Sequence, residues 1–228
     1  MGTRIRNLGT LAVSIFVSAA FAQQSYQLDL TGVGDGAVAD GVYVSPYQGT
    51  VSTYDGTQIY SGYMICDDFF TDSFLNVPWN ATATNAGSLN GTEKFNGVTY
   101  SNPALGLATT TTQQDYNAVA WLADQLLMPS NLKSSAVQTN LSFAIWDIFD
   151  GLTTDPSGGA MNDIKAAFNA VQGGYVGSGW TVFTPSPSNA SQEFLVKTPE
   201  PPEPAILCLD LLFTLAVIFL LRRYRVQA

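Results

Sequence analysis

Two short segments say most about how this chain is built: Tyr63-Met64-Ile65-Cys66-Asp67-Asp68-Phe69 and Leu141-Ser142-Phe143-Ala144-Ile145-Trp146-Asp147-Ile148-Phe149. The first ends a stretch, residues 58–69, whose β-branched and aromatic residues favour a strand. The second places apolar residues at helical spacing from Ser134 or Ser135 onward, and Asp150-Gly151 is typical of a helix end. The domain that contains them therefore combines strands with helices.

The residues around these two segments extend the same pattern. Residues 26–107 alternate in short runs that predict strands and turns, the clearest being residues 41–47, 58–69 and 77–84. Apolar positions then recur at helical spacing in residues 113–127 and again in residues 161–171.

Strand character returns near the end of this region, in residues 179–184 and 193–196. Strands, a helical block and a closing hairpin predict a single α+β domain of antiparallel strands with two to three helices.

The N-terminal residues are typical of a secretory signal peptide. Arg4 and Arg6 precede an apolar stretch, and Ala20-Phe21-Ala22 has small residues where a signal peptidase would cut before Gln23. An uncleaved N-terminal anchor is the alternative. We expect residues 1–22 to be removed, leaving an extracytoplasmic domain of residues 23–198.

The C-terminal residues have three parts in a fixed order. Pro199-Glu200-Pro201-Pro202-Glu203-Pro204 precedes an apolar run of residues 205–221, and Arg222, Arg223 and Arg225 follow it. The run predicts a transmembrane helix whose basic end stays in the cytoplasm, although Asp210 within it opposes insertion. The alternative is a buried C-terminal helix of a soluble domain.

This order of Pro-Glu-Pro, hydrophobic helix and arginines resembles the PEP-CTERM sorting signal of Gram-negative bacteria, here residues 199–228. The resemblance implies processing by an exosortase-type sorting enzyme at the inner membrane, after the signal peptidase has acted. The protein would be transiently anchored, with its tail cytoplasmic, and then reach the cell surface or be secreted. The Pro-Glu-Pro motif occurs twice, and either copy could be read.

Composition excludes several functions for the exported part. The whole chain has net charge −9, and residues 23–198 contain 15 acidic residues against four lysines, so nucleic acid is not an expected partner. Histidine is absent, which removes the commonest general base and metal ligand. We therefore predict no metal and no cofactor.

Cys66 is the one cysteine of the exported part, because Cys208 falls in the predicted membrane segment. An unpaired thiol in an oxidising compartment needs a reason. It is either a small buried hydrophobic residue or a reactive group.

The strand that ends in Cys66 and the helix that carries Trp146 resemble the thioester domains of exported surface proteins. In that family a strand cysteine bonds to a glutamine four residues before a helix tryptophan, and a surface amine or hydroxyl attacks the acyl group. The resemblance matches Cys66 and Trp146, but Ser142 stands at the glutamine position and has no acyl carbon. Gln138 lies one helical turn earlier and is the alternative partner.

The residues thus predict a thioester-domain-like scaffold that has lost its crosslink, in a non-enzymatic protein with a structural or adhesive role. Extracellular polysaccharide is a further expected partner. A covalent adhesin using Cys66 and Gln138 is one alternative. Another is a carbohydrate-active enzyme using Asp147 and Asp150 as acid and base. Asp67, Asp68 and Asp72 could bind calcium, but they lack the spacing of a calcium loop.

Overall fold

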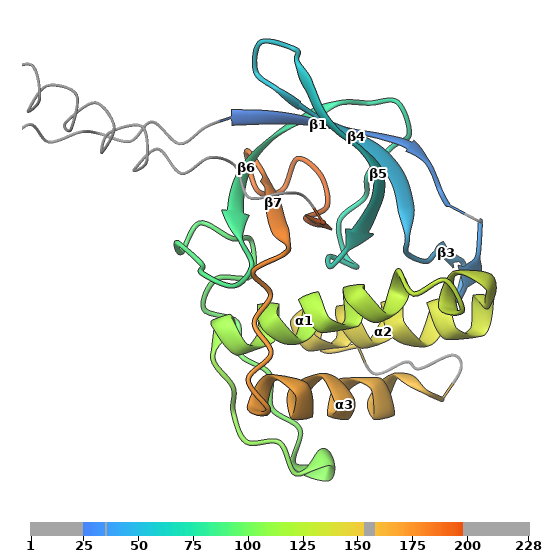
Figure 1. The fold of residues 1–228 in the computed structure, drawn as a ribbon, viewed down its shortest axis with the longest axis vertical. Coiled ribbons are helices and arrows are strands. Elements are labelled where there is room, and N and C mark those ends of the chain that lie inside the picture. The colour runs from blue at the N-terminus through green and yellow to red at the C-terminus, as the bar shows by residue number, and fades with distance from the viewer. Residues whose placement is uncertain (1–24, 35, 153–157, 198–228) are drawn as a thin grey trace, which may run out of the picture.

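The computed structural model describes residues 25–34, 36–152 and 158–197 (Figure 1). The predicted signal peptide, the Pro-Glu-Pro motif, the apolar run and the three C-terminal arginines all lie outside these residues. Within the described ranges, no helix is both long enough and apolar enough to cross a membrane.

Six strands close into an antiparallel barrel in the order β1-β4-β5-β8-β7-β6. Their bounds are β1 Ser25–Gly32, β4 Tyr47–Thr53, β5 Gln58–Cys66, β6 Trp79–Asn85, β7 Thr181–Pro185 and β8 Phe194–Val196. A separate two-stranded sheet pairs β2 Val38–Ala39 with β3 Val42–Tyr43. Alternate residues of β1, Tyr26, Leu28 and Leu30, point into the barrel and are buried.

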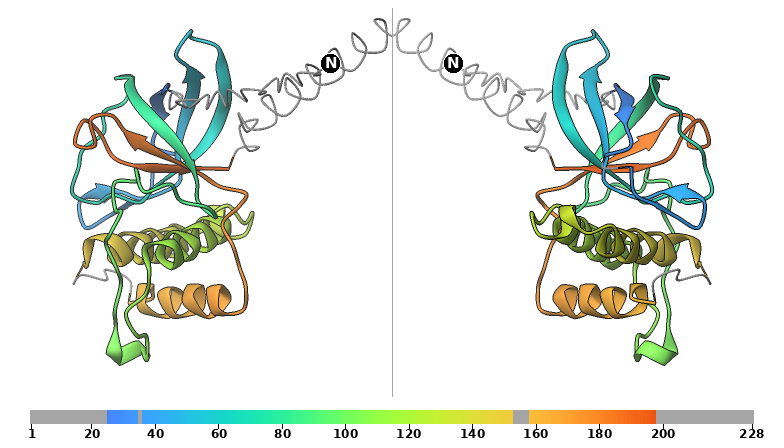
Figure 2. Two further views of the ribbon diagram at one scale, coloured as in Figure 1. Left: turned by 90° about the vertical axis from the view of Figure 1, so that its left-hand side faces the viewer. Right: turned by 90° about the vertical axis from the view of Figure 1, so that its right-hand side faces the viewer.

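Three α-helices form two layers against one side of the barrel (Figures 1 and 2). They are α1 Thr112–Leu126, α2 Ser135–Asp150 and α3 Ala160–Gln172. α1 and α2 lie next to the barrel, and α3 packs against both of them on the far side. Short 3₁₀ helices at Pro103–Leu105 and Asn131–Lys133 complete the described elements.

The helix ends follow from local sequence. Thr111 and Gln114 form a capping box at the start of α1, and Ser134 accepts a hydrogen bond from the backbone N–H of Val137 at the start of α2. Gly151 ends α2 with φ of 62°, a conformation that favours glycine.

Two apolar cores result. One fills the barrel and includes Cys66, and the other lies between the helices and the barrel wall and includes Ile65. Neighbouring residues of β5 thus face different cores, as strand alternation requires.

The predicted α+β class, the antiparallel strands and the three helices are confirmed. The prediction of one strand over residues 41–47 is wrong. β3 ends at Tyr43 and β4 begins only at Tyr47, with Pro46 between them, and proline has no N–H for a strand ladder.

Candidate functional site

Cys66 lies at the end of β5 and is fully buried. Its S–H donates to the carbonyl oxygen of Asp68 at 3.2 Å, and its backbone N–H donates to Ser45 Oγ at 3.1 Å. Both groups of the residue are therefore already engaged within the protein.

The helix α2 brings Trp146 and Ser142 to the same place. Trp146 Nε1 donates to the carbonyl oxygen of Cys66 at 3.0 Å. Ser142 Oγ accepts the backbone N–H of Ser45 at 3.0 Å, and Ser45 Oγ in turn accepts that of Cys66. The structure thus joins Cys66, Ser142 and Trp146 through hydrogen bonds to the backbone, with Ser45 as the link that the sequence did not indicate.

Gln138, the other residue considered as a partner of Cys66, is buried one turn earlier on α2. Its side-chain Nε2 donates to the carbonyl oxygen of Leu132 at 2.9 Å, in the 3₁₀ helix that precedes α2. The side-chain amide of Gln138 thus links α2 to the 3₁₀ helix that precedes it.

Burial and nearby acids keep the thiol of Cys66 protonated. Desolvation raises its pKa well above the ordinary value, and the charge of Asp67 raises it further. A nucleophilic cysteine needs the opposite, a positive or polar surrounding that lowers the pKa. The observed environment suits an inert buried thiol.

The acids after Cys66 form a buried cluster with Glu193, the residue just before β8. Glu193 is fully buried, and Tyr116 Oη donates to it at 2.5 Å. Thr184 Oγ1 and the backbone N–H of Lys94 also donate to it, the latter at 2.9 Å. Glu193 was missed at the sequence level, although one acid beside the apolar run Phe194-Leu195-Val196 was a usable signal.

Asp67 is fully buried, and neither carboxylate oxygen has a hydrogen-bond donor. Burial and the charge of Glu193 raise its pKa well above the ordinary value. A proton on Asp67 resolves the conflict, because the carboxyl group then becomes a donor toward Glu193. The two acids act as a pair that shares one proton.

Asp68 is also buried, and its partner is Lys94. Asp72, the third acid of the expected calcium group, is exposed, whereas Asp67 and Asp68 are buried. Among the described residues, no three acidic or cysteine side chains are grouped so that they could hold a metal ion.

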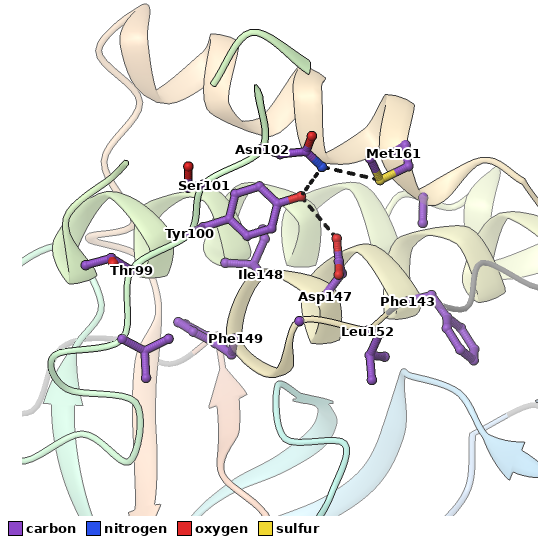
Figure 3. Close-up of a pocket in the computed structure, with 13 residues that line it drawn as sticks. Thr99, Tyr100, Ser101, Asn102, Phe143, Asp147, Ile148, Phe149, Leu152 and Met161 are labelled. Carbon is purple, nitrogen blue, oxygen red and sulfur yellow. Dashed lines mark hydrogen bonds between the residues drawn. The ribbon is translucent and has the colours of Figure 1, made fainter. Parts of the chain in front are cut away.

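A pocket of about 600 Å³ lies between α2, the start of α3 and residues 98–102 (Figure 3). Tyr100 Oη donates to Asp147 Oδ2 at 3.1 Å, and Asn102 Nδ2 donates to Tyr100 Oη at 3.1 Å. Apolar side chains such as Phe143 and Met161 line the rest. The pocket combines an apolar wall with a small polar group on one side, an arrangement common in ligand sites.

Asp147 and Asp150 do not share this pocket. Asp147 lines it, whereas Asp150 Oδ2 accepts the backbone N–H of Phe69 at 2.7 Å. The two acids considered as a glycosidase pair are thus committed to different neighbours.

A second groove of about 360 Å³ lies beside Trp146. Phe69 packs on Trp146 with ring centres 5.2 Å apart, and Tyr43 and Phe74 at its edge are 49% and 65% exposed. Asp72 is its one charged lining residue. Aromatic groups of this kind are common at binding surfaces.

Comparison with known proteins shows a faint likeness to a solved structure. No protein-family model matches the chain, and no curated protein matches it. A solved structure that resembles it is the N-terminal thioester domain of a surface protein from Clostridium perfringens, at 14% sequence identity and a TM-score of 0.39. The likeness covers 76% of this chain and 98% of that one. At this level, the chemistry has to be decided from the residues of this chain.

Proposed function

We propose that this chain is an exported surface or extracellular-matrix protein with a non-enzymatic, structural or adhesive role, built on a thioester-like scaffold without the Cys-Gln crosslink. The observation that carries the absence of the crosslink is the hydrogen bond from the backbone N–H of Ser45 to Ser142 Oγ. Where a glutamine would donate an acyl group, this helix has a serine that holds the backbone beside Cys66.

Three features support the absence of a thioester. Serine has no acyl carbon, so Ser142 cannot form one. The side-chain amide of Gln138 donates a hydrogen bond to the carbonyl oxygen of Leu132, and the thiol of Cys66 donates one to the carbonyl oxygen of Asp68. The raised pKa of Cys66 also removes the thiolate that must attack the amide.

Export and sorting rest on the sequence alone. Residues 1–22 would be removed by signal peptidase, and residues 199–228 would be read by an exosortase-type enzyme at the inner membrane. Replacing Arg222, Arg223 and Arg225 together by Ala should leave an unprocessed, membrane-bound form. Unchanged size and release would contradict the sorting proposal without touching the proposal for the domain.

An adhesive role needs a surface for a non-covalent partner, and extracellular polysaccharide is our candidate. The groove beside Trp146 offers exposed Tyr43 and Phe74 as stacking surfaces, with Asp72 as a hydrogen-bond acceptor. No lysine or arginine lines it, so a neutral glycan fits this groove better than a polyanionic one.

Intact-mass analysis tests the central claim. A Cys-Gln thioester lowers the mass by about 17 Da, the mass of ammonia, and methylamine restores it by opening the bond. We expect no loss that responds to methylamine. Cyclisation of an N-terminal Gln23 would also remove about 17 Da, but it does not respond to methylamine, so a methylamine-sensitive loss would favour the covalent adhesin instead.

A further inference from the structure

Lys94 and Asp68 form a nearly enclosed ion pair between the end of β5 and residues 90–97. Their side chains are 17% and 2% exposed, and Lys94 Nζ contacts Asp68 Oδ2 directly. Lys94 Nζ also donates to Thr71 Oγ1 at 2.6 Å. No other ion pair of the described residues is so enclosed, because the Lys197 and Asp124 side chains are 56% and 28% exposed.

Both partners are held in place by further hydrogen bonds of their backbone groups and of the Asp68 carboxylate. The N–H of Lys94 donates to Glu193 Oε2 at 2.9 Å. The carbonyl oxygen of Asp68 accepts from Gln192 Nε2 at 2.7 Å, and Asp68 Oδ1 accepts the N–H of Thr71 at 3.2 Å. An amine and a carboxyl group fixed in contact in this way have a very high effective concentration toward each other.

A further acid, Asp150, is held close to Asp68, because Asp150 Oδ2 accepts the backbone N–H of the next residue, Phe69, at 2.7 Å. Burial raises the pKa of Asp150 to about 6, and the charges of both Asp68 and Lys94 act on its carboxyl group. A group that titrates near neutral pH can take up a proton and return it. The charges of Asp68 and Asp150 also raise the pKa of Asp67, after burial and the charge of Glu193, so Asp67 belongs to the same cluster of acids.

We propose that Lys94 and Asp68 condense to an intramolecular isopeptide bond between Lys94 Nζ and Asp68 Cγ. The ammonium group first gives a proton to Asp150. The amine then attacks Cγ, the new C–N bond forms, and one C–O bond of Asp68 breaks. The departing oxygen leaves as water with two protons from the former ammonium group, one of them returned by Asp150. Atoms and charges balance within the ion pair, with no oxidant or added co-reactant.

Burial favours the product over the ion pair. Burying two charged groups costs desolvation free energy, whereas the neutral amide that would form between them does not carry this cost. The bond would join residue 68, just after β5, to residue 94, in the segment between β6 and α1. It uses neither Cys66 nor Gln138, so it stands or falls separately from the proposed function.

Trypsin provides a direct test on the full-length chain. Trypsin cleaves the peptide bond after a lysine whose side-chain amine is free, and it does not cleave after an acylated lysine. An unlinked chain, denatured and digested, releases residues 95–133 as a separate peptide. We expect that peptide to be missing, replaced by one that spans Lys94, is lighter by about 18 Da and does not change with methylamine. Release of residues 95–133 with unaltered mass upstream would show an ion pair only and overturn the proposal.

Variants separate the bond from its surroundings. Lys94→Arg keeps the positive charge, but a guanidinium group cannot form this amide, so the 18 Da loss should disappear. Lys197→Arg changes the exposed pair in the same way and should keep the loss. Asp150→Asn should slow formation at least tenfold at pH 7 and abolish its dependence on pH between about 5 and 7, if Asp150 carries the proton. Formation at the normal rate in this variant would overturn the role of Asp150.

Discussion

Ser142 illustrates how one side chain determines the chemistry that a helix can support. Serine has no acyl carbon to give to a thiol, and the hydroxyl of Ser142 accepts the N–H of Ser45 beside Cys66. The residue is fully buried, so the hydrogen bond replaces water that is no longer present. Ser142 thus connects α2, through Ser45, to the end of β5.

Ser142→Ala should therefore destabilise the protein. The N–H of Ser45 would lose its acceptor in a buried place, which costs about 1–3 kcal/mol. Chemical denaturation measures the change, with Ser135→Ala as the control, because Ser135 is exposed on the same helix. Equal effects of the two substitutions would show that the hydrogen bond contributes nothing.

Cys66 should behave as a free but protected thiol. We expect a thiol reagent to leave Cys66 unmodified in the folded chain and to label it fully in denaturant, since the thiol is buried and has a raised pKa. Peptide mass spectrometry separates it from Cys208. Resistance that persists in denaturant would indicate an acylated or oxidised cysteine instead.

At the scale of elements, the close approach of β4 to its neighbours depends on Gly49. A Cβ there would lie 2.1 Å from Met64 Sδ and 2.7 Å from the backbone oxygen of Asp29. Both β1 and β5 can therefore approach β4 this closely only because residue 49 has no side chain. The local pattern of β-branched and aromatic residues predicts β4 and β5 separately, but it cannot show how closely they pass.

Gly49→Ala should lower the melting temperature by several degrees, because the barrel would have to open around the new methyl group at a cost of about 1–3 kcal/mol. Gly179→Ala is the matched control, since a Cβ at Gly179 meets no atom within 4 Å. A melting temperature equal to that of the control variant would contradict this account of the strand packing.

Local sequence patterns predict an element but not its contacts with distant residues, and this explains which elements are predictable. The three helices are predictable because their apolar spacing and caps are local. The strand expected over residues 41–47 is interrupted at residues 44–46, which include Pro46. The local sequence does not distinguish β1 from the strands and turns around it, and it does not predict that six strands close into a barrel. Closure depends on pairing β1 with β6 and β5 with β8, contacts that no local pattern encodes.

For the molecule as a whole, buried acids set the response to pH. Burial raises the pKa of Asp115 to about 6, although Thr110 and the N–H of Tyr100 donate to it. An unfolded aspartate titrates near 3.9, so between about pH 4 and 6 the folded state binds more protons than the unfolded state. This contribution to stability is complete at low pH and is lost as the pH rises through about 6.

We therefore expect the melting temperature to fall as the pH is raised from about 4.5 to 7. The net charge of −9 acts in the same direction, so the variant Asp115→Asn is needed to isolate the residue. Its melting temperature should depend less steeply on pH over this interval. A melting temperature that rises with pH in the unmodified protein would refute the assignment of raised pKa values.

The sequence by itself determined the kinds of element, the absence of histidine chemistry and the impossibility of a thioester at Ser142, because each depends on residue identity or local spacing. Only the tertiary structure decided which distant residues meet. Lys94 reaches Asp68, Glu193 reaches Tyr116, and Ser45 links Ser142 to Cys66. These contacts arise because the closed barrel and the helix layer bury charged groups that must then find partners within the protein.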